Sequence, residues 1–181
     1  MRTTLLRTLL IGSVAVATLL LPAVSAQASA PEKENDTVQT TAPAGDVGIQ
    51  VTKLSHADAT ARLRSSGITW SSSGGCSDRN NPTCTSFSQV NLATIQGAQT
   101  LRSSSGCALN VTGGTETGHA SGTYSHWNGY KLDFSLSTCI QNYVSRNFTF
   151  IGGTSWRSGS GNVYYREGNH WDVTYYNCGG C

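Results

Sequence analysis

Residues 162–176 read NVYYREGNHWDVTYY, and this stretch decides the fold class. Runs of aromatic and β-branched residues at 162–166 and 170–176 flank the pair Gly168 and Asn169. Such runs favour strands, and a short link that contains Gly favours a tight turn between them. The sequence therefore predicts two strands joined by a tight turn, which is an antiparallel β-hairpin.

The residues before this hairpin predict helices first and strands afterwards. A helix is expected over 56–66, because Ser55 suits an N-cap and Gly67 a helix end. A second helix is expected from Ser86 to Gly106. Further strands are expected at 68–70, 107–112, 130–136 and 145–151. This order favours an α+β fold in which N-terminal helices pack on a small, mostly antiparallel sheet.

Residues 1–28 have the features of a secretory signal peptide. Arg2 and Arg7 supply the positive charge, residues 9–21 are apolar or small, and small residues suited to cleavage follow. The apolar run is shorter than the roughly 20 residues that span a membrane. We therefore expect cleavage and secretion, with an uncleaved N-terminal anchor as the alternative.

The rest of the chain is expected to form a flexible leader over 29–50 and one domain over 51–181. The leader holds few large apolar side chains. The chain has 12 Lys and Arg against 10 Asp and Glu, and removal of Arg2 and Arg7 with the signal peptide makes the two numbers equal. A mature chain that is neutral overall and has no basic run argues against a nucleic-acid partner. We expect a monomer that has no membrane contact after cleavage.

All six cysteines lie within the expected domain, and an even number behind a signal peptide indicates three disulfides. The sequence does not choose among the possible pairings. We expect the first and last pairs to close short loops rich in Gly, Asn and Pro. The alternative for the last pair is a redox or metal-binding CxxC motif. The expected pairs are Cys76–Cys84, Cys107–Cys139 and Cys178–Cys181.

Two of the four histidines have neighbours that suit a metal site. His126 and Asp133 lie seven residues apart, and Gly129 between them offers the bend that an odd spacing needs to bring both side chains to one face. Glu167 and His170 flank the predicted hairpin turn. A catalytic zinc takes three protein ligands and leaves one position open.

These residues predict zinc ligands at His126, Asp133 and His170, with Glu167 as the general base. Glu167 as a fourth ligand, which would block catalysis, is an alternative. Each residue also has a structural explanation: a histidine in a surface loop, a carboxylate at a strand edge, and a hairpin turn with polar ends.

The pattern S-H-x-x-G-x-x-x-D followed by E-x-x-H resembles the zinc D-Ala-D-Ala carboxypeptidase family, which includes L-alanyl-D-glutamate endopeptidases. The resemblance covers residues 85–176. It implies the Hedgehog/DD-peptidase fold, zinc ligands at His126, Asp133 and His170, and Glu167 as the base. The sequence departs from the family at Lys131, where a small residue is common.

A second departure from this family lies in the stretch Gly-Gly-Thr-Glu, at residues 113–116, which lacks the Arg that many members have there. That role falls to His119 or is absent. We expect His119 to contact substrate or an oxyanion, and the alternative is a loop histidine bonded to backbone. Asp172 could orient a ligand histidine, or it could be a surface carboxylate.

The expected function is therefore that of a secreted zinc metallopeptidase, a carboxypeptidase or endopeptidase that hydrolyses stem or cross-link peptides of peptidoglycan. One alternative is a non-catalytic module of the same fold that binds the cell wall or a partner. Another is a glycan-cleaving enzyme that pairs Glu116 with Glu167. Trp127, Trp156 and Trp171 could line a groove or pack in the core.

Overall fold

The computed structural model describes residues 51–176, all of which belong to one compact unit, Ala44–Cys181. The signal peptide predicted at 1–28, the leader predicted at 29–50 and the predicted pair Cys178–Cys181 lie outside the described residues. Within residues 51–176, no helix has the length and apolar character needed to cross a membrane.

The described residues form a mixed α+β fold, as predicted. Its helices are α1 (His56–Ser65), α2 (Leu92–Ser105) and α3 (Thr138–Asn147). Its strands are β1 (Lys53–Leu54), β2 (Thr69–Trp70), β3 (Val90–Asn91), β4 (Asn110–Gly113), β5 (Lys131–Ser135), β6 (Thr149–Gly152), β7 (Ser155–Arg157), β8 (Val163–Glu167) and β9 (His170–Thr174).

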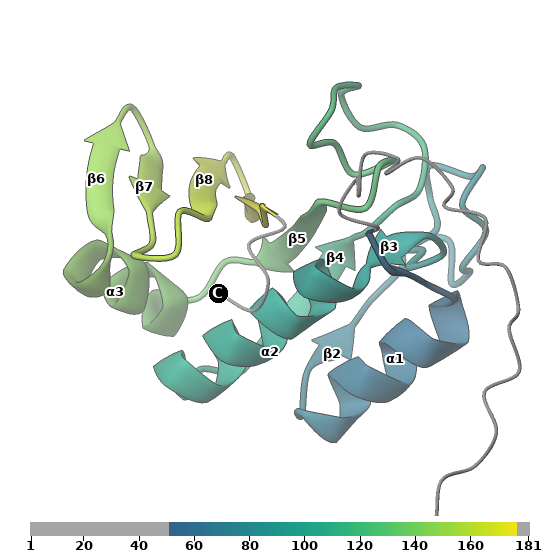
Figure 1. Cartoon of the computed structure of the whole chain (residues 1–181), viewed down its shortest axis with the longest axis horizontal. Helices are drawn as coiled ribbons and strands as arrows, with labels where there is room; N and C mark the ends of the chain where they lie inside the picture. The colour runs from purple at the N-terminus through teal and green to yellow at the C-terminus, as the bar shows by residue number, and fades with distance from the viewer. Residues whose placement is uncertain (1–50, 177–181) are drawn as a thin grey trace, which may run out of the picture. The chain divides into compact units, whose positions relative to one another are not determined.

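Seven strands form one sheet in the order β2-β4-β5-β9-β8-β7-β6, and β1 pairs with β3 in a separate small sheet. The pairings in the large sheet are antiparallel except for β2 with β4. The predicted hairpin is present as β8 and β9, and Gly168 and Asn169 form its turn. Helices α1 and α2 lie side by side, and the β6–β7 hairpin extends away from α3 (Figure 1).

The core lies between the helices and one face of the large sheet. Side chains alternate between the two faces of a strand, so residues 132 and 134 of β5 point to the same side. These residues, Leu132 and Phe134, are buried in one cluster with Trp171 of β9, Leu63 of α1 and Ile95 of α2. The other face of the same strands is therefore left for polar side chains.

Local sequence explains the first helix as predicted. The Ser55 side chain accepts a hydrogen bond from the amide of Asp58, which satisfies one free donor of the first turn. The second helix begins at Leu92 and not at Ser86, so this predicted boundary is wrong. The reason is a long-range contact: Val90 and Asn91 form β3, which pairs with β1. The helical spacing of the apolar residues in this segment does not reveal that pairing.

The predicted strand over 145–151 is wrong in its first half, because residues 145–147 form the last turn of α3. Ser137 caps this helix by accepting a bond from the Ile140 amide, and Ile140 and Val144 bury one face of it. This cap and the four-residue apolar spacing are the local signal for the missed helix. Strand β7 was likewise not predicted.

Two of the three predicted disulfides are present. Cys76 pairs with Cys84, and Cys107 pairs with Cys139, which joins the end of α2 to the start of α3. The first bond closes a short loop, as expected from its Gly, Asn and Pro content. The second bond links the segment after α2 to the first turn of α3.

Candidate metal centre

The polar face of the sheet gathers several predicted site residues from three neighbouring strands. In the register of β5 and β9, Asp133 lies opposite Asp172, and Ser135 lies opposite His170. In the register of β8 and β9, His170 lies opposite Glu167. Cross-strand partners share a face, so these carboxylates and His170 lie on the side away from the core.

A turn brings His126 to the same place. The Gly129 amide donates to the His126 carbonyl at 2.8 Å, and Gly129 has a φ of +79°, which favours Gly. A Cβ at this position would also meet the Gln89 carbonyl at 2.5 Å. The predicted bend is confirmed, and it places His126 Nε2 3.2 Å from Asp133 Oδ1.

The orientation of His126 leaves the correct nitrogen free for a metal. Its Nδ1 lies 2.7 Å from the Gly114 carbonyl, which can only accept, so Nδ1 donates the proton. Nε2 then faces Asp133 with a lone pair. Ligand histidines in proteins usually have one ring nitrogen fixed in this way by an outer acceptor.

His119 has a similar arrangement, which the sequence did not reveal. Its Nε2 lies 3.3 Å from Glu116 Oε1, and its Nδ1 lies 3.8 Å from Asp133 Oδ2. Its ring stacks on that of His126 with centroids 3.8 Å apart. His119 therefore has a carboxylate partner and two neighbours in the polar cluster, and the alternative of a loop histidine bonded to backbone is not what the structure has.

The third histidine of this face, His170, lies beside the same carboxylate. Its Nε2 is 3.6 Å from Asp133 Oδ1, and its Nδ1 is 3.0 Å from Asn169 Oδ1. Glu167 approaches it, with Oε2 3.7 Å from His170 Nε2, and the Glu167 side chain is 53% exposed. The structure thus puts the predicted base at the solvent side of the cluster.

His119, His126 and Asp133 form a group that could hold a metal ion, because their ligand atoms all lie within 4.8 Å of one another. This group shares His126 and Asp133 with the predicted set. His170 contacts Asp133 but stands beside the three-residue group, and His119 takes the third place in it.

The electrostatics of Asp133 suit a bound cation. Its Oδ1 is buried and has no hydrogen-bond partner among the described residues. Burial alone would raise the pKa of Asp133, but His126, His170 and His119 outweigh it and lower that pKa. The ionised form of Asp133 is therefore favoured, and its Oδ1 faces the Nε2 atoms of His126 and His170, as a metal-ligand oxygen would.

Asp172 adds a second buried carboxylate directly opposite the first. Lys131 Nζ lies 2.7 Å from Asp172 Oδ2, while Asp172 Oδ1 is buried without a partner in the described part of the chain. Like charges at opposite positions of two strands destabilise a sheet. Lys131, which departs from the family pattern in sequence, offsets one of the two charges, and the histidines face the other.

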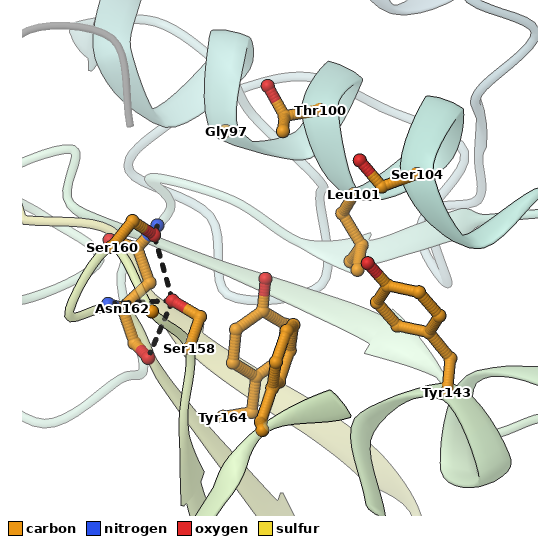
Figure 2. Close-up of a pocket in the computed structure, with 11 residues that line it drawn as sticks. Gly97, Thr100, Leu101, Ser104, Tyr143, Ser158, Ser160, Asn162 and Tyr164 are labelled. Carbon is orange, nitrogen blue, oxygen red and sulfur yellow. Dashed lines mark hydrogen bonds between the residues drawn. The ribbon is translucent and has the colours of Figure 1, made fainter. Parts of the chain in front are cut away.

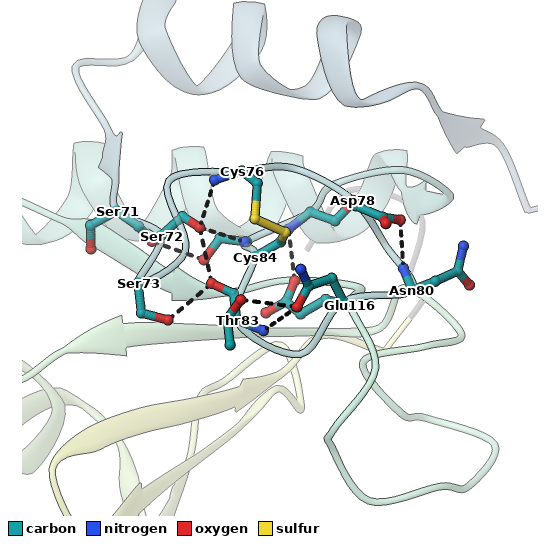
Figure 3. Close-up of a disulfide and its surroundings, with 12 residues drawn as sticks. Ser71, Ser72, Ser73, Cys76, Asp78, Asn80, Thr83, Cys84 and Glu116 are labelled. Atoms are coloured by element: carbon teal, nitrogen blue, oxygen red, sulfur yellow. Dashed lines mark hydrogen bonds between the residues drawn. A yellow bond between two sulfur atoms is a disulfide. The ribbon is translucent and has the colours of Figure 1, made fainter.

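Glu116 is a structural anchor and not a free acid. Its carboxylate accepts from the Ser86 amide at 2.7 Å and from the Gly114 amide at 3.0 Å. Figure 3 shows Glu116 in the surroundings of the Cys76–Cys84 disulfide. Burial tends to raise its pKa, but hydrogen bonds from His119 and these amides outweigh burial and lower that pKa. The acid of a glycosidase pair needs a raised pKa, so Glu116 does not fit that role in a pairing with Glu167.

A pocket of about 270 Å³ opens beside His119, and Trp127 and Asn128 contribute to its wall. The Arg79 guanidinium stacks 3.6 Å above the Trp127 ring, and its Nε donates to the Thr115 carbonyl. Trp127 is 43% exposed, whereas Trp171 is buried and Trp156 packs against it. Of the three tryptophans, Trp127 lines this pocket, Trp171 belongs to the core and Trp156 packs against the core.

A separate pocket of about 170 Å³ lies between α2, α3 and β8 (Figure 2). Leu101, Tyr143 and Tyr164 line it together with Ser, Thr and Asn side chains, and its described lining has no His, Cys, Asp or Glu. This pocket therefore differs from the polar face, where histidines and carboxylates gather. His56, for which no role was predicted, is also outside that face and accepts a bond from the Phe87 amide.

Comparisons with protein families, curated proteins and solved structures found no match for this chain. The geometry of the site is therefore the basis for an assignment.

Proposed function

We propose that this protein is a secreted zinc metallopeptidase of the Hedgehog/DD-peptidase fold that hydrolyses peptide bonds of peptidoglycan. One observation carries the proposal: three histidines direct one ring nitrogen each toward the buried carboxylate of Asp133. The other nitrogen of each ring is held by an outer acceptor, namely Glu116, the Gly114 carbonyl and Asn169.

The donor set fits zinc. Imidazole nitrogen and carboxylate oxygen bind zinc at about 2.0–2.2 Å, which places neighbouring ligand atoms of a tetrahedral ion about 3.4 Å apart. The Nε2 atoms of His126 and His170 lie 3.2 and 3.6 Å from Asp133 Oδ1, close to that value, and His119 Nδ1 lies 3.8 Å from the other oxygen, Oδ2. The buried Oδ1 of Asp133, which has no hydrogen-bond partner among the described residues, also suits a zinc ligand.

In this proposal, His126, Asp133 and His170 hold the ion. Zinc supplies a Lewis acid, which acidifies water and polarises a peptide carbonyl. Glu167 Oε2, on the exposed side of His170, takes a proton from the attacking water and returns it to the leaving amine. The groove that Trp127 lines beside His119 receives part of the peptide.

Export is part of the same proposal. The two disulfides of the described domain are typical of proteins in an oxidising compartment. They agree with the signal peptide expected at 1–28, and a peptidoglycan peptide is a substrate outside the cell membrane.

The test is digestion of purified muropeptides by the zinc-loaded protein, followed by mass spectrometry of the products. We expect new amino groups or free D-Ala from the wild type, and loss of cleavage in Glu167→Gln with zinc content unchanged. Full cleavage by Glu167→Gln would contradict the assigned base. No cleavage by zinc-loaded wild type over long incubation would contradict the peptidase itself.

A non-catalytic module of the same fold is a second candidate, and His119 is the observation that favours it. Four protein ligands, with His119 added to the other three, would fill a tetrahedral zinc and leave no open position, as in structural sites. This candidate predicts binding to isolated cell walls in a pull-down, without release of peptide fragments.

A further inference from the structure

The loop from Gly114 to His126 contains a pair, Glu116 and His119, that the proposed peptidase mechanism does not use. Glu116 is among the most buried acidic residues described, and His119 is 26% exposed at the mouth of the groove. A buried carboxylate thus holds a partly exposed imidazole beside the candidate metal centre.

The two nitrogens of His119 have different surroundings. Nε2 meets Glu116 Oε1 at 3.3 Å, and a carboxylate at that position selects the tautomer with the proton on Nε2. Nδ1 then presents a lone pair toward Asp133 Oδ2, 3.8 Å away. This is the arrangement of His126, with a carboxylate in place of the Gly114 carbonyl and the nitrogens exchanged.

Glu116 is fixed well enough to orient a ligand. Its carboxylate accepts from two backbone amides, Ser86 and Gly114, which lie on different segments of the chain. A carboxylate that is held by the backbone and holds a histidine is the usual outer partner of a metal ligand. The same carboxylate ties the segment after the Cys76–Cys84 loop to the end of β4.

The position of His119 distinguishes it from the other candidate ligands. Asp133 and His170 lie on central strands, and the His126 side chain is only 4% exposed. His119 follows Gly118, whose φ of +104° few other residues adopt, in a loop without regular structure. It is therefore the candidate ligand that combines a loop position with a partly exposed side chain.

We propose that His119, positioned by Glu116, is an exchangeable fourth ligand of the ion held by His126, Asp133 and His170. The inference rests on the metal centre of the proposed function. When His119 is bound, four protein ligands complete the site. When it is released toward the groove, a position opens beside Trp127, where a peptide can reach the centre.

The experiment measures zinc affinity by competition with a chromophoric chelator, and the visible spectrum of the cobalt-substituted protein. For His119→Ala we expect affinity to fall by a factor of about 10–100 and the cobalt spectrum to change from a four-coordinate form to one that responds to added acetate. Glu116→Gln should lower zinc affinity by a smaller factor than His119→Ala. His56→Gln is the matched control, because His56 lies outside the site and should leave both readouts unchanged.

Three results would overturn the inference. One is an affinity of His119→Ala within twofold of the wild type. The second is a cobalt spectrum that is the same in both proteins. The third is an affinity loss in His56→Gln as large as in His119→Ala. His126→Ala separates this failure from that of the proposed function: if the wild type binds zinc and His126→Ala does not, the metal centre stands and the role of His119 alone is wrong.

Discussion

The two faces of the large sheet are built from alternate residues of the same strands, and they differ in almost every physical respect. In β5, Leu132 and Phe134 are buried in the apolar core, while Asp133 between them faces the polar side. In β9, Trp171 and Val173 join the core, while His170 and Asp172 face the other way. One face is stabilised by removal of apolar area from water, and the other places two carboxylates opposite each other.

The polar face is therefore where function is expected. An apolar face needs no explanation beyond stability. Buried charges are costly unless a partner offsets them, and the partners here are three imidazoles and one Lys. Substitutions at adjacent residues of one strand therefore test this contrast. On the polar face they should change zinc affinity, and on the apolar face they should change stability.

The largest effect is expected from Asp133→Asn. The substitution keeps the shape of the side chain but removes the charge that the three histidines face, so zinc affinity should fall by more than the roughly 10–100-fold that outer-sphere changes cost. The metal-free protein should stay folded. Chelator competition and circular dichroism check the two statements, and retention of wild-type affinity would contradict the contrast.

Leu132→Ala, at the adjacent residue on the opposite face, should have the reverse effect. Leu132 is fully buried, so its truncation should lower the free energy of unfolding by about 2–5 kcal/mol. The folded fraction should still bind zinc with nearly wild-type affinity. Urea denaturation of the metal-free protein and chelator competition provide the measurements, and a large affinity loss here would mean that the two faces are not independent.

Loss of either disulfide should lower stability, but only one of the two losses should also lower zinc affinity. The Cys107–Cys139 bond closes the longer loop, so its loss should lower the free energy of unfolding by about 3–4 kcal/mol. Zinc affinity should stay unchanged. Loss of Cys76–Cys84 should lower the free energy of unfolding by about 2–3 kcal/mol. It should also lower zinc affinity, because the Ser86 amide in the following segment donates to Glu116, which holds His119. Double Cys→Ser variants, unfolded in urea and titrated with zinc, give both quantities, and equal affinity in the two variants would count against the link through Glu116.

The smallest effect concerns His56 and the dependence of stability on pH. Burial, and then the charge of Arg64, lower the pKa of His56, and its neutral Nδ1 accepts the Phe87 amide. The neutral form is thus favoured in the folded state. Its contribution to stability is present above the unfolded pKa and is lost as the pH falls through the lowered folded pKa.

The His56→Gln variant, whose amide oxygen can still accept that bond, should lose less stability than the wild type between about pH 7.5 and about pH 5. Urea unfolding of both metal-free proteins at the two pH values measures the difference. Both proteins contain the same remaining titratable groups, so identical losses would show that His56 contributes nothing to the pH dependence.

Local patterns were enough to predict the elements whose signals are local. The β8–β9 hairpin follows from two strand-forming runs around Gly168, and the N-cap at Ser55 predicts the start of α1. The bend at Gly129 was inferred from the odd spacing between His126 and Asp133 alone. In each case, the residues that decide the structure are close neighbours in sequence.

Long-range contacts explain what the sequence did not reveal. The start of α2 depends on a pairing between β1 and β3, and the position of His119 depends on Glu116, which is fixed by an amide 30 residues away in sequence. The seven-residue interval between His119 and His126 was visible, but it does not specify that their rings stack. Zinc, the base Glu167 and the peptidoglycan substrate stay predictions until they are measured.

The most direct test of the metal centre is the metal content of the purified protein with its disulfides intact, measured by elemental mass spectrometry beside the double variant His126→Ala/His170→Ala. The account predicts about one zinc per wild-type chain and none in the variant. A wild-type protein without zinc, even after reconstitution with excess metal, would contradict it, because the cluster around Asp133 would then be stabilised by its histidines and Lys131 alone.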